Sequence, residues 1–227
     1  MSETSDKSNI FAYETGCYAL IINKDSVLGG SNFRKAFAKS IHRNRLKNEL
    51  QKPLSESGSL VPNTVLLNGY ALSSKIAVTL PPSYEPNEAH SLYIAGAEDT
   101  KDMPSKIDIL YYGKEEIANM ALLVAENMQQ ALGAVVNAIS TDSEESLSYA
   151  VKNGEYTLAL VPISAVSSDP AQCFEQFTGS SNNNIFGVSN SDFDNAVAKI
   201  KPNSKEETVI KASETALKEL INDIQVI

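Results

Sequence analysis

Cysteine, histidine and long apolar runs are scarce in this sequence of 227 residues. A membrane span needs roughly 18 or more consecutive apolar residues, and no segment of the chain offers them. The two cysteines, Cys17 and Cys173, are too few and too far apart for a disulfide framework or a Cys-x-x-Cys metal site, so we expect small buried apolar side chains there. The start, MSETSDKSN, also lacks the basic and apolar stretches of a signal peptide. The sequence therefore predicts a soluble chain.

Positive charge is also in short supply. The chain has 19 Lys and Arg against 28 Asp and Glu, which gives a net charge of -9. Such a chain repels phosphate backbones and anionic lipid surfaces, so we expect no nucleic-acid partner. The hydrophobic fraction of 42% is nevertheless large enough to form a buried core, which excludes a disordered chain.

The catalytic motifs that we sought are missing. The sequence has no GxSxG, HExxH, GxxxxGK[ST] or GxGxxG pattern. Of the two histidines, His42 is expected on the polar side of a helix and His90 in a Pro-rich loop. We therefore expect a protein that is not an enzyme, with no metal and no cofactor.

The first half of the chain begins regularly and then loses its periodicity. Residues 18–23 predict a buried strand, which is closed by a turn at Gly29-Gly30 and followed by a helix that Ser31 or Asn32 caps. Residues 54–106, by contrast, are interrupted by Pro and Gly and predict a loop-rich crossing with short strands near 63–67 and 76–80.

The second half alternates strands and helices. Strands are predicted at 107–112, 134–139 and 156–161, with a helix ending at Gly133 after the first of them. A capping box at 141–144 opens the next helix. Strand, helix, strand, helix, strand is the pattern of βαβ units in a covered, mostly parallel sheet, so the predicted class is α/β.

The last quarter predicts short helices. Asp169-Pro170 offers an N-cap followed by Pro at the first helical position, and Phe174 and Phe177 lie on one face of that helix. A second capping box at 204–207 opens the final long helix, and residues 225–227 read as the start of another strand.

The residues after the third predicted strand of the sheet are the candidate binding site. Open parallel sheets bind ligands outside the carboxyl ends of their strands. We therefore predict a ligand-binding loop there, with Asn183 of the Asn-rich turn as a further donor; an ordinary loop and an ordinary turn are the competing interpretations. The candidate residues of the loop are Ile163, Ser164, Ala165, Val166 and Ser167.

Several degenerate motifs follow one another along the chain, and their succession is more specific than any one of them. Asn23 ends a strand ahead of a helix of the type x-R-x-A-x-x-x-x-I-x-R at 33–43, and a strand, a long helix and a second strand span 107–139. Asp169-Pro170 then starts a helix, and 193–200 has the form F-D-x-A-V-x-x-I. This succession resembles the extracellular solute-binding proteins of peptide and nickel ABC transporters, known as family 5, whose helix matching 33–43 ends in I-D-R; here His42 replaces the usual Asp.

The resemblance implies a three-layer α/β lobe with βαβ units, the C-terminal lobe of a periplasmic-binding-protein-like fold of type II. Residues 1–17 would be a leader and entry segment and 18–227 a single solute-binding lobe, which closes on its ligand against a second lobe absent from this chain. It also implies a small solute or peptide as ligand and an ABC-transporter permease as partner of the full-length protein. The location would be extracytoplasmic, at the cell surface as a lipoprotein or in the periplasm, with the export signal absent here.

One departure from the family bears on the ligand. Oligopeptide-binding members carry an Asp for the ligand's α-amine in the loop after the third strand, and the matching position here is Val166. The three arginines, Arg34, Arg43 and Arg45, all lie far ahead of that loop in sequence. A buried ammonium without a partner costs several kcal/mol, so either the other lobe anchors the ligand or the ligand is not a free peptide.

Two other functions stay open at this point. The lobe could be the ligand sensor of a regulator fused to a DNA-binding domain. It could also be a fragment of a hydrolase with Ser164 or Ser167 as nucleophile, although neither has a histidine near it in sequence.

Overall fold

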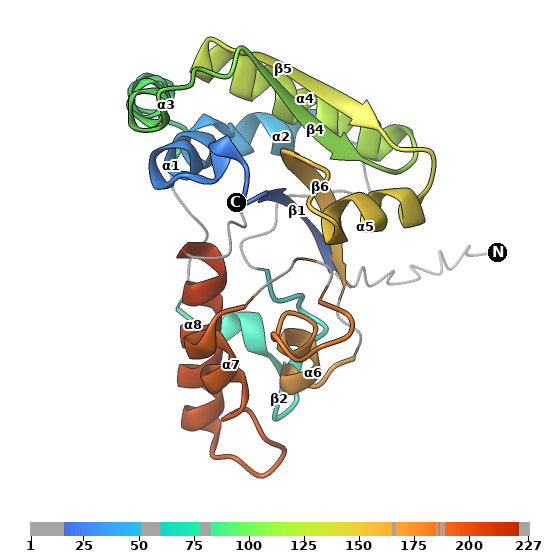
Figure 1. Cartoon of the computed structure of the whole chain (residues 1–227). Coiled ribbons are helices and arrows are strands. Elements are labelled where there is room, and N and C mark those ends of the chain that lie inside the picture. Colours follow the sequence, from blue (N-terminus) through green and yellow to red (C-terminus); the bar gives the residue numbers. More distant parts are fainter. Residues whose placement is uncertain are drawn as a thin grey trace, which may run out of the picture.

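The computed structural model describes residues 16–50, 60–77, 83–164, 167–184, 186 and 189–222. Its main sheet has four strands in the order β1-β6-β4-β5 (Figure 1). The central strand β4 runs parallel to both of its neighbours, whereas β1 pairs with β6 in the antiparallel sense. The predicted α/β class with a mostly parallel sheet is therefore confirmed. The strands are β1 (Gly16–Ile22), β4 (Lys106–Tyr111), β5 (Val135–Ser140) and β6 (Leu158–Ser164).

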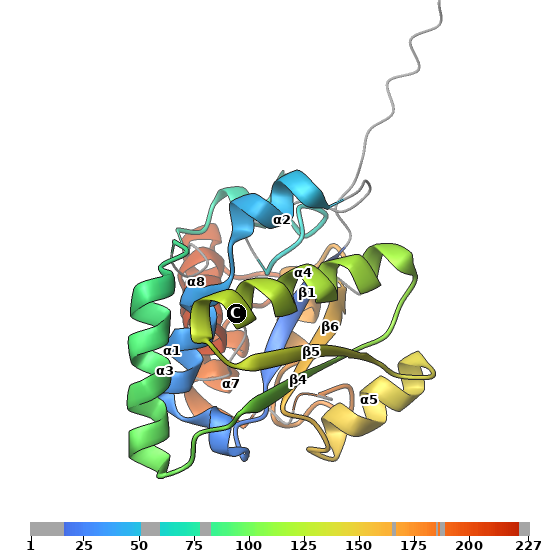
Figure 2. The same cartoon turned by 90° about the horizontal axis from the view of Figure 1, so that it is seen from above.

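Four helices lie together on one side of the sheet, with α4 along β4 and β5 and the pair α1 and α3 beside it (Figure 2). We call the apolar cluster that they form with the sheet the upper core, after its place in Figure 1. The helices are α1 (Ser31–Ser40), α2 (Arg43–Glu49), α3 (Pro86–Thr100) and α4 (Glu115–Leu132). Large members of the upper core are Leu20, Ile22, Phe33, Phe37, Tyr93, Ile107, Ile109, Met128, Leu158 and Leu160.

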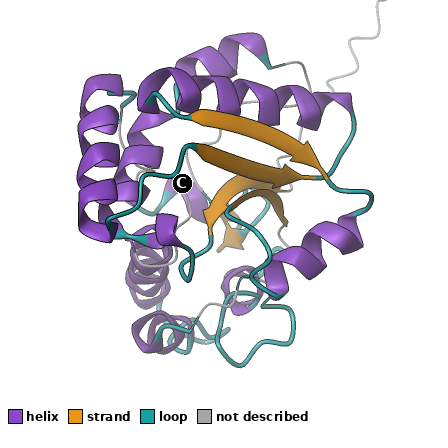
Figure 3. Cartoon of the chain, turned by 45° about the horizontal axis from the view of Figure 1, so that its top comes forward, coloured by secondary structure: helices purple, strands orange, loops and turns teal. Residues whose placement is uncertain are grey.

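The opposite face of β1 and β6 is covered by shorter helices, by α8 and by a small hairpin, whose apolar side chains form the lower core (Figures 1 and 3). The helices are α5 (Glu144–Lys152), α6 (Pro170–Glu175), α7 (Ser191–Val197) and α8 (Glu206–Asn222). The hairpin consists of β2 (Leu66–Leu67) and β3 (Tyr70–Ala71), and the described residues also include two short 3-10 helices, η1 (Val27–Gly29) and η2 (Leu72–Ser74). Large members of the lower core are Ile21, Leu72, Leu147, Val161, Ile163, Phe174, Phe193, Val209 and Leu217.

The strands β1 and β6 belong to both cores. Successive side chains of a strand point to opposite faces of a sheet. In β1, Leu20 and Ile22 therefore enter the upper core, while Ile21 enters the lower one. The two layers of helices are thus joined through a shared pair of strands.

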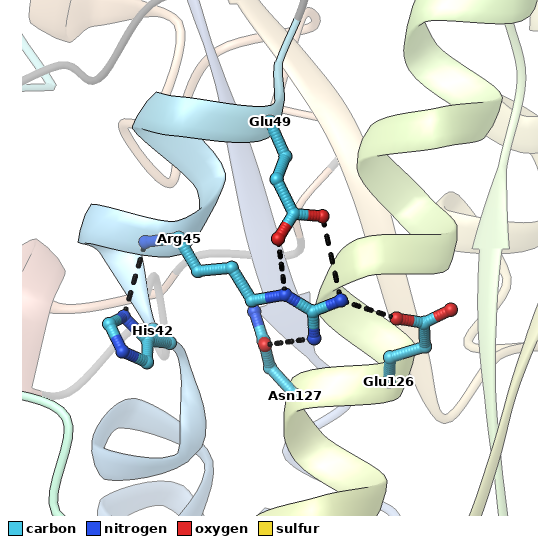
Figure 4. A network of polar contacts seen from close by, with 5 residues as sticks. All are labelled: His42, Arg45, Glu49, Glu126 and Asn127. Atoms are coloured by element: carbon cyan, nitrogen blue, oxygen red, sulfur yellow. Dashed lines mark hydrogen bonds and ion pairs between the residues drawn. The ribbon is translucent and has the colours of Figure 1, made fainter.

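The chain leaves the regular α1 helix at Ile41 and restarts as α2, where the sequence predicted one helix through Arg43. His42, expected on a polar helix face, is the N-cap of α2, and its Nδ1 accepts a hydrogen bond from the Arg45 backbone N–H at 3.2 Å. Figure 4 shows how the Arg45 guanidinium then reaches α4, donating to Asn127 Oδ1 at 3.1 Å and to Glu126 Oε2 at 2.8 Å. Arg45 thereby fastens the short α2 to the long α4.

The prediction of a loop-rich crossing over 54–106 is wrong in its second part, because α3 is a helix of 15 residues. Its buried side is made of small residues and one tyrosine, so the periodicity of large apolar residues is weak. Gly96 lets α3 lie close to α1, since a Cβ there would come within 2.9 Å of the Phe33 ring. His90, expected in a loop, therefore lies on a helix.

The short strands expected in that crossing are partly correct. The pair β2 and β3 turns at Asn68-Gly69, both with positive φ (53° and 82°), which is the backbone that an Asn-Gly hairpin turn requires. Residues 76 and 77 are not in a strand, and 78–82 lie outside the described residues, as do 225–227.

Helix caps were predicted with mixed success. Gly133 at the end of α4 has φ 71°, and Asp169 Oδ1 accepts from the Ala171 N–H at 2.8 Å, both as expected. The N-cap of α1, however, is Gly30, and that of α5 is Ser143 rather than Thr141. Likewise α8 begins at Glu206, which places Lys205 rather than Ser204 at its N-cap position.

Candidate functional site

Strand β6 extends beyond the end of its parallel neighbour β4. It pairs with β1 over its whole length, from Leu158 opposite Ile22 to Ser164 opposite Gly16. Its pairing with β4 covers only residues 158–160. The prediction that this strand ends at Val161 is therefore wrong, and residues 161–164 have a strand on one side only.

The direction of the backbone groups along β6 follows from one hydrogen bond. Asn23 N donates to Thr157 O at 3.0 Å, and these residues stand opposite each other in the register of β1 and β6. Because bonded and non-bonded pairs alternate in an antiparallel ladder, the odd-numbered residues of β6 bond to β1. The even-numbered residues, Pro162 and Ser164 among them, direct their backbone groups away from β1, toward the side of β4.

Pro162 explains why the parallel ladder stops. The next bond on the β4 side would run from the N–H of residue 162 to the carbonyl of Tyr112, and proline has no N–H. The antiparallel ladder is unaffected because the nitrogen of Pro162 faces away from β1. We call the Pro162 carbonyl and the Ser164 N–H and carbonyl the free edge of β6, since no described strand pairs with them.

Three distant segments fix the end of β6. Gly16 lies so close that a Cβ there would stand 2.7 Å from Ile163 O. Gln176, just after α6, donates through Nε2 to Ser164 O at 3.3 Å and to Cys173 O at 2.8 Å. The segment that follows is held by the hairpin, because the N–H of Leu66 donates to the carbonyl of Ser168 at 2.8 Å.

The candidate binding residues predicted from the sequence lie in different environments. Ile163 is 2% exposed and its side chain packs in the lower core, while Ser164 is the exposed last residue of β6. The hydroxyl of Ser167 accepts from the N–H of Asp169 at 2.9 Å. Asn183 is exposed in its turn, where its N–H donates to Ser181 Oγ at 3.3 Å; no described contact joins it to the strand end. Ala165 and Val166 lie outside the described residues.

Sequence reasoning missed the residues that shape the free edge. The sequence pattern places Pro162 in the loop, although a proline within an apolar run that still pairs on one side is typical of an edge position. Gln176 carries no sequence signal, because its partners are backbone carbonyls. The prediction that the leader extends to residue 17 is wrong for Gly16, which is the first residue of β1.

The arrangement supplies hydrogen bonds rather than acid-base groups. The thiol of Cys173 is buried, and burial raises its pKa to about 12, so it stays protonated at neutral pH. His90 lies elsewhere, with Nδ1 3.0 Å from the carbonyl of Leu132 at the end of α4, and His42 caps α2. In the part of the chain that the structure describes, no cluster of His, Cys, Asp or Glu could hold a metal ion.

Comparison with known proteins finds no matching family model and no matching curated protein. Solved structures do match. The pheromone receptor PrgZ, solved for its mode of peptide binding, is 20% identical with a TM-score of 0.76, over 98% of this chain and 44% of that one. OppA of Listeria monocytogenes with bound peptide is 16% identical with a TM-score of 0.77, again over 98% and 44%. OppA of Haemophilus influenzae in complex with the peptide RPPGFSPFR is 20% identical with a TM-score of 0.76, over 95% and 43%.

These matches define the fold as periplasmic-binding-protein-like. More particularly, it is the fold of part of the peptide-binding proteins of ABC transporters, so the resemblance drawn from the sequence motifs is confirmed at the level of the fold. The chain spans about 44% of the length of PrgZ and of the Listeria protein. None of the helices described here is long and apolar enough to cross a membrane.

Proposed function

We propose that this chain is a ligand-binding lobe of an extracellular solute-binding protein that serves an ABC transporter of the oligopeptide or dipeptide class. The lobe binds and releases its solute without chemical change. The lobe includes the whole of β1 and therefore begins at Gly16 rather than at residue 18. In the full-length protein the partner is the membrane permease, and the location is extracytoplasmic, as a surface lipoprotein or in the periplasm. The proposal is supported by the fold, which PrgZ and OppA share and which in those structures binds peptides.

The free edge of β6 is the observation that carries the proposal. An extended peptide can add to a sheet edge through main-chain hydrogen bonds, which give affinity without demanding a particular side chain. The Pro162 carbonyl can accept a peptide N–H, and the Ser164 N–H can donate to a peptide carbonyl. Ala165, Val166, Ser167 and Asn183 remain predicted contacts around this edge, whereas the backbone groups of Ile163 face β1 and its side chain lies in the lower core.

Closure completes the site. The free edge is short and open, whereas ligand sites bury most of the ligand surface. We propose that the second lobe of a longer protein supplies the opposite wall and closes on the solute by a hinge motion. The chain alone should therefore bind peptides weakly.

Pro162→Val tests the role of the edge. Valine has an N–H that can donate to the Tyr112 carbonyl, so the parallel ladder can lengthen and occupy the edge. We expect Pro162→Val to weaken peptide binding roughly threefold to tenfold, as the loss of about one hydrogen bond predicts. Titration calorimetry of the chain against peptide and nickel-chelate panels is the measurement.

Pro86→Ala is the control, because Pro86 stands at the first turn of α3 in the upper layer. It should bind peptides like the unchanged chain. Tight peptide binding by the chain alone would contradict the need for a second lobe. Equal affinity of Pro162→Val and the unchanged chain would contradict the edge as the binding surface.

A further inference from the structure

The side chain of Gln176 already occupies one group of the free edge. Its Nε2 carries two hydrogens, and they serve two carbonyls from different elements: Cys173 O in α6 and Ser164 O at the end of β6. The Ser164 carbonyl is one of the three backbone groups that a strand-like solute would use.

The two hydrogen bonds of Gln176 are unequal. The bond to Cys173 O measures 2.8 Å, close to the usual length for N–H···O, while the bond to Ser164 O measures 3.3 Å, beyond the usual range. The short bond holds the Gln176 amide against α6, the helix that ends just before Gln176. The long bond can therefore be given up while the side chain keeps its anchor.

We infer that Gln176 is a gate of the free edge: its amide holds the Ser164 carbonyl until a solute N–H replaces it. The inference rests on the proposed function and names what regulates that same site. In the empty lobe the amide satisfies a carbonyl that would otherwise invite pairing with another chain. On binding, a solute must displace this bond, so solutes that cannot donate an N–H at this point are disfavoured.

Removing the gate should strengthen binding. Leucine at position 176 keeps a similar volume but has no donor, so the Ser164 carbonyl becomes available without competition. The net worth of one neutral hydrogen bond corresponds to a gain of roughly threefold to tenfold in affinity for Gln176→Leu. Gln172→Leu is the matched control, because Gln172 is exposed on the same helix α6.

The experiment is an NMR titration of the ¹⁵N-labelled 227-residue chain with tetraalanine capped at both ends. In the unchanged chain we expect the backbone N–H of Ser164 and the side-chain NH₂ of Gln176 to shift together along one binding curve. Because this readout needs no variant, it tests the gate even if Gln176→Leu folds poorly.

The outcomes separate the gate from the proposed function. If Ser164 shifts while the Gln176 side chain does not, or if Gln176→Leu binds no more tightly than Gln172→Leu, the gate is wrong and the edge stands. If the peptide leaves Ser164 unshifted in every form of the chain, both the gate and the peptide-binding edge are wrong.

Discussion

The upper and lower cores are built by different means. In the upper core, long helices bury large side chains, and the rings of Phe33 and Tyr93 meet edge to face with centroids 5.3 Å apart. The lower layer contains shorter pieces of chain that polar contacts tie together. Glu206 at the start of α8, for example, accepts hydrogen bonds from Lys75 and Asn68 of the hairpin segment.

Two further hydrogen bonds of the lower layer likewise join a carboxylate on a helix to another segment of the chain. Glu214 of α8 accepts from the N–H of Ala77 at 2.9 Å, and Asp194 of α7 accepts from the N–H of Gly179 at 3.1 Å. Each joins a helix to a segment that has no regular structure of its own. The upper layer has polar contacts as well, but there they join one helix to another, as in the ion pairs Lys39–Glu88 and Arg45–Glu126. In the lower layer they also bind backbone N–H groups of segments outside the helices and strands.

The largest expected effect comes from truncating an aromatic side chain in either core. Phe33→Ala and Phe193→Ala each remove a ring that is 0% exposed, and each should lower the free energy of unfolding by about 3–5 kcal/mol. Because β1 and β6 supply both cores, we expect either variant to unfold in a single transition. Urea unfolding followed by circular dichroism measures both quantities.

Tyr149→Ala is the control for these truncations, since Tyr149 is 62% exposed and its loss should change stability by about 0.5 kcal/mol or less. Two separate transitions in Phe193→Ala would show that the two layers unfold independently and would contradict their coupling through β1 and β6.

An intermediate effect is expected at the joint between the layers. Gly16→Ala would place a methyl group 2.7 Å from Ile163 O and 3.1 Å from Ser164 Oγ. Relief of the first contact needs a backbone shift, so we expect a loss of about 1–3 kcal/mol of unfolding free energy, measured by urea unfolding.

The double variant Gly16→Ala/Ser164→Ala identifies the source of that loss. Removing the Ser164 hydroxyl leaves the backbone contact with Ile163 O in place, so the double variant should be as unstable as Gly16→Ala. Recovery of stability would show that the side chain, and not the strand backbone, sets the spacing.

The smallest effect concerns acid stability of the lower layer. Lys75, and then Asn68, lower the pKa of Glu206 below its ordinary value of 4.5 through hydrogen bonds. A carboxyl with a depressed folded-state pKa stabilises the fold above its unfolded pKa, and this contribution is lost as the pH falls through the folded pKa. Stability should therefore decline below about pH 4.5, and Lys75→Met should make this decline shallower.

Lys211→Met is the matched comparison, because Lys211 pairs with Glu207 on the surface of α8 with both side chains more than 70% exposed. Exposed pairs contribute little, so the acid dependence should change less than in Lys75→Met. The measurement is the urea midpoint of the unchanged chain, Lys75→Met and Lys211→Met at neutral and at acid pH. An equal change in both variants would contradict the special role of the hairpin tie.

The βαβ part of the fold could be predicted from the sequence because its strands and helices carry their own periodicity. The helix α3 could not, since it packs through Ala89, Gly96 and Ala97, and small residues give little apolar contrast along a helix. Its close approach to Phe33 depends on the absence of a side chain at Gly96, which only the folded structure explains.

The sequence suggests where to look for the candidate site, but it does not reveal the hydrogen-bonding groups found there. The rule that ligands bind beyond strand ends selects the end of β6 as the candidate, and this stays a prediction. The open edge, however, depends on which way the Pro162 nitrogen faces, and this follows from the register with β1. The bond from Gln176 to Ser164 depends on how α6 folds back, which no local pattern encodes.

The alternation of side chains along β6 also governs how accurately its last residues are placed. A slip of one residue against β1 would turn Val161 and Ile163 out of the lower core and drive Leu158 and Leu160 into the wrong layer. Such a slip would cost the burial of several aliphatic side chains at once, so the strand has one alignment. The acceptors and the donor at its tip are therefore positioned by hydrophobic side chains that lie inside the two cores.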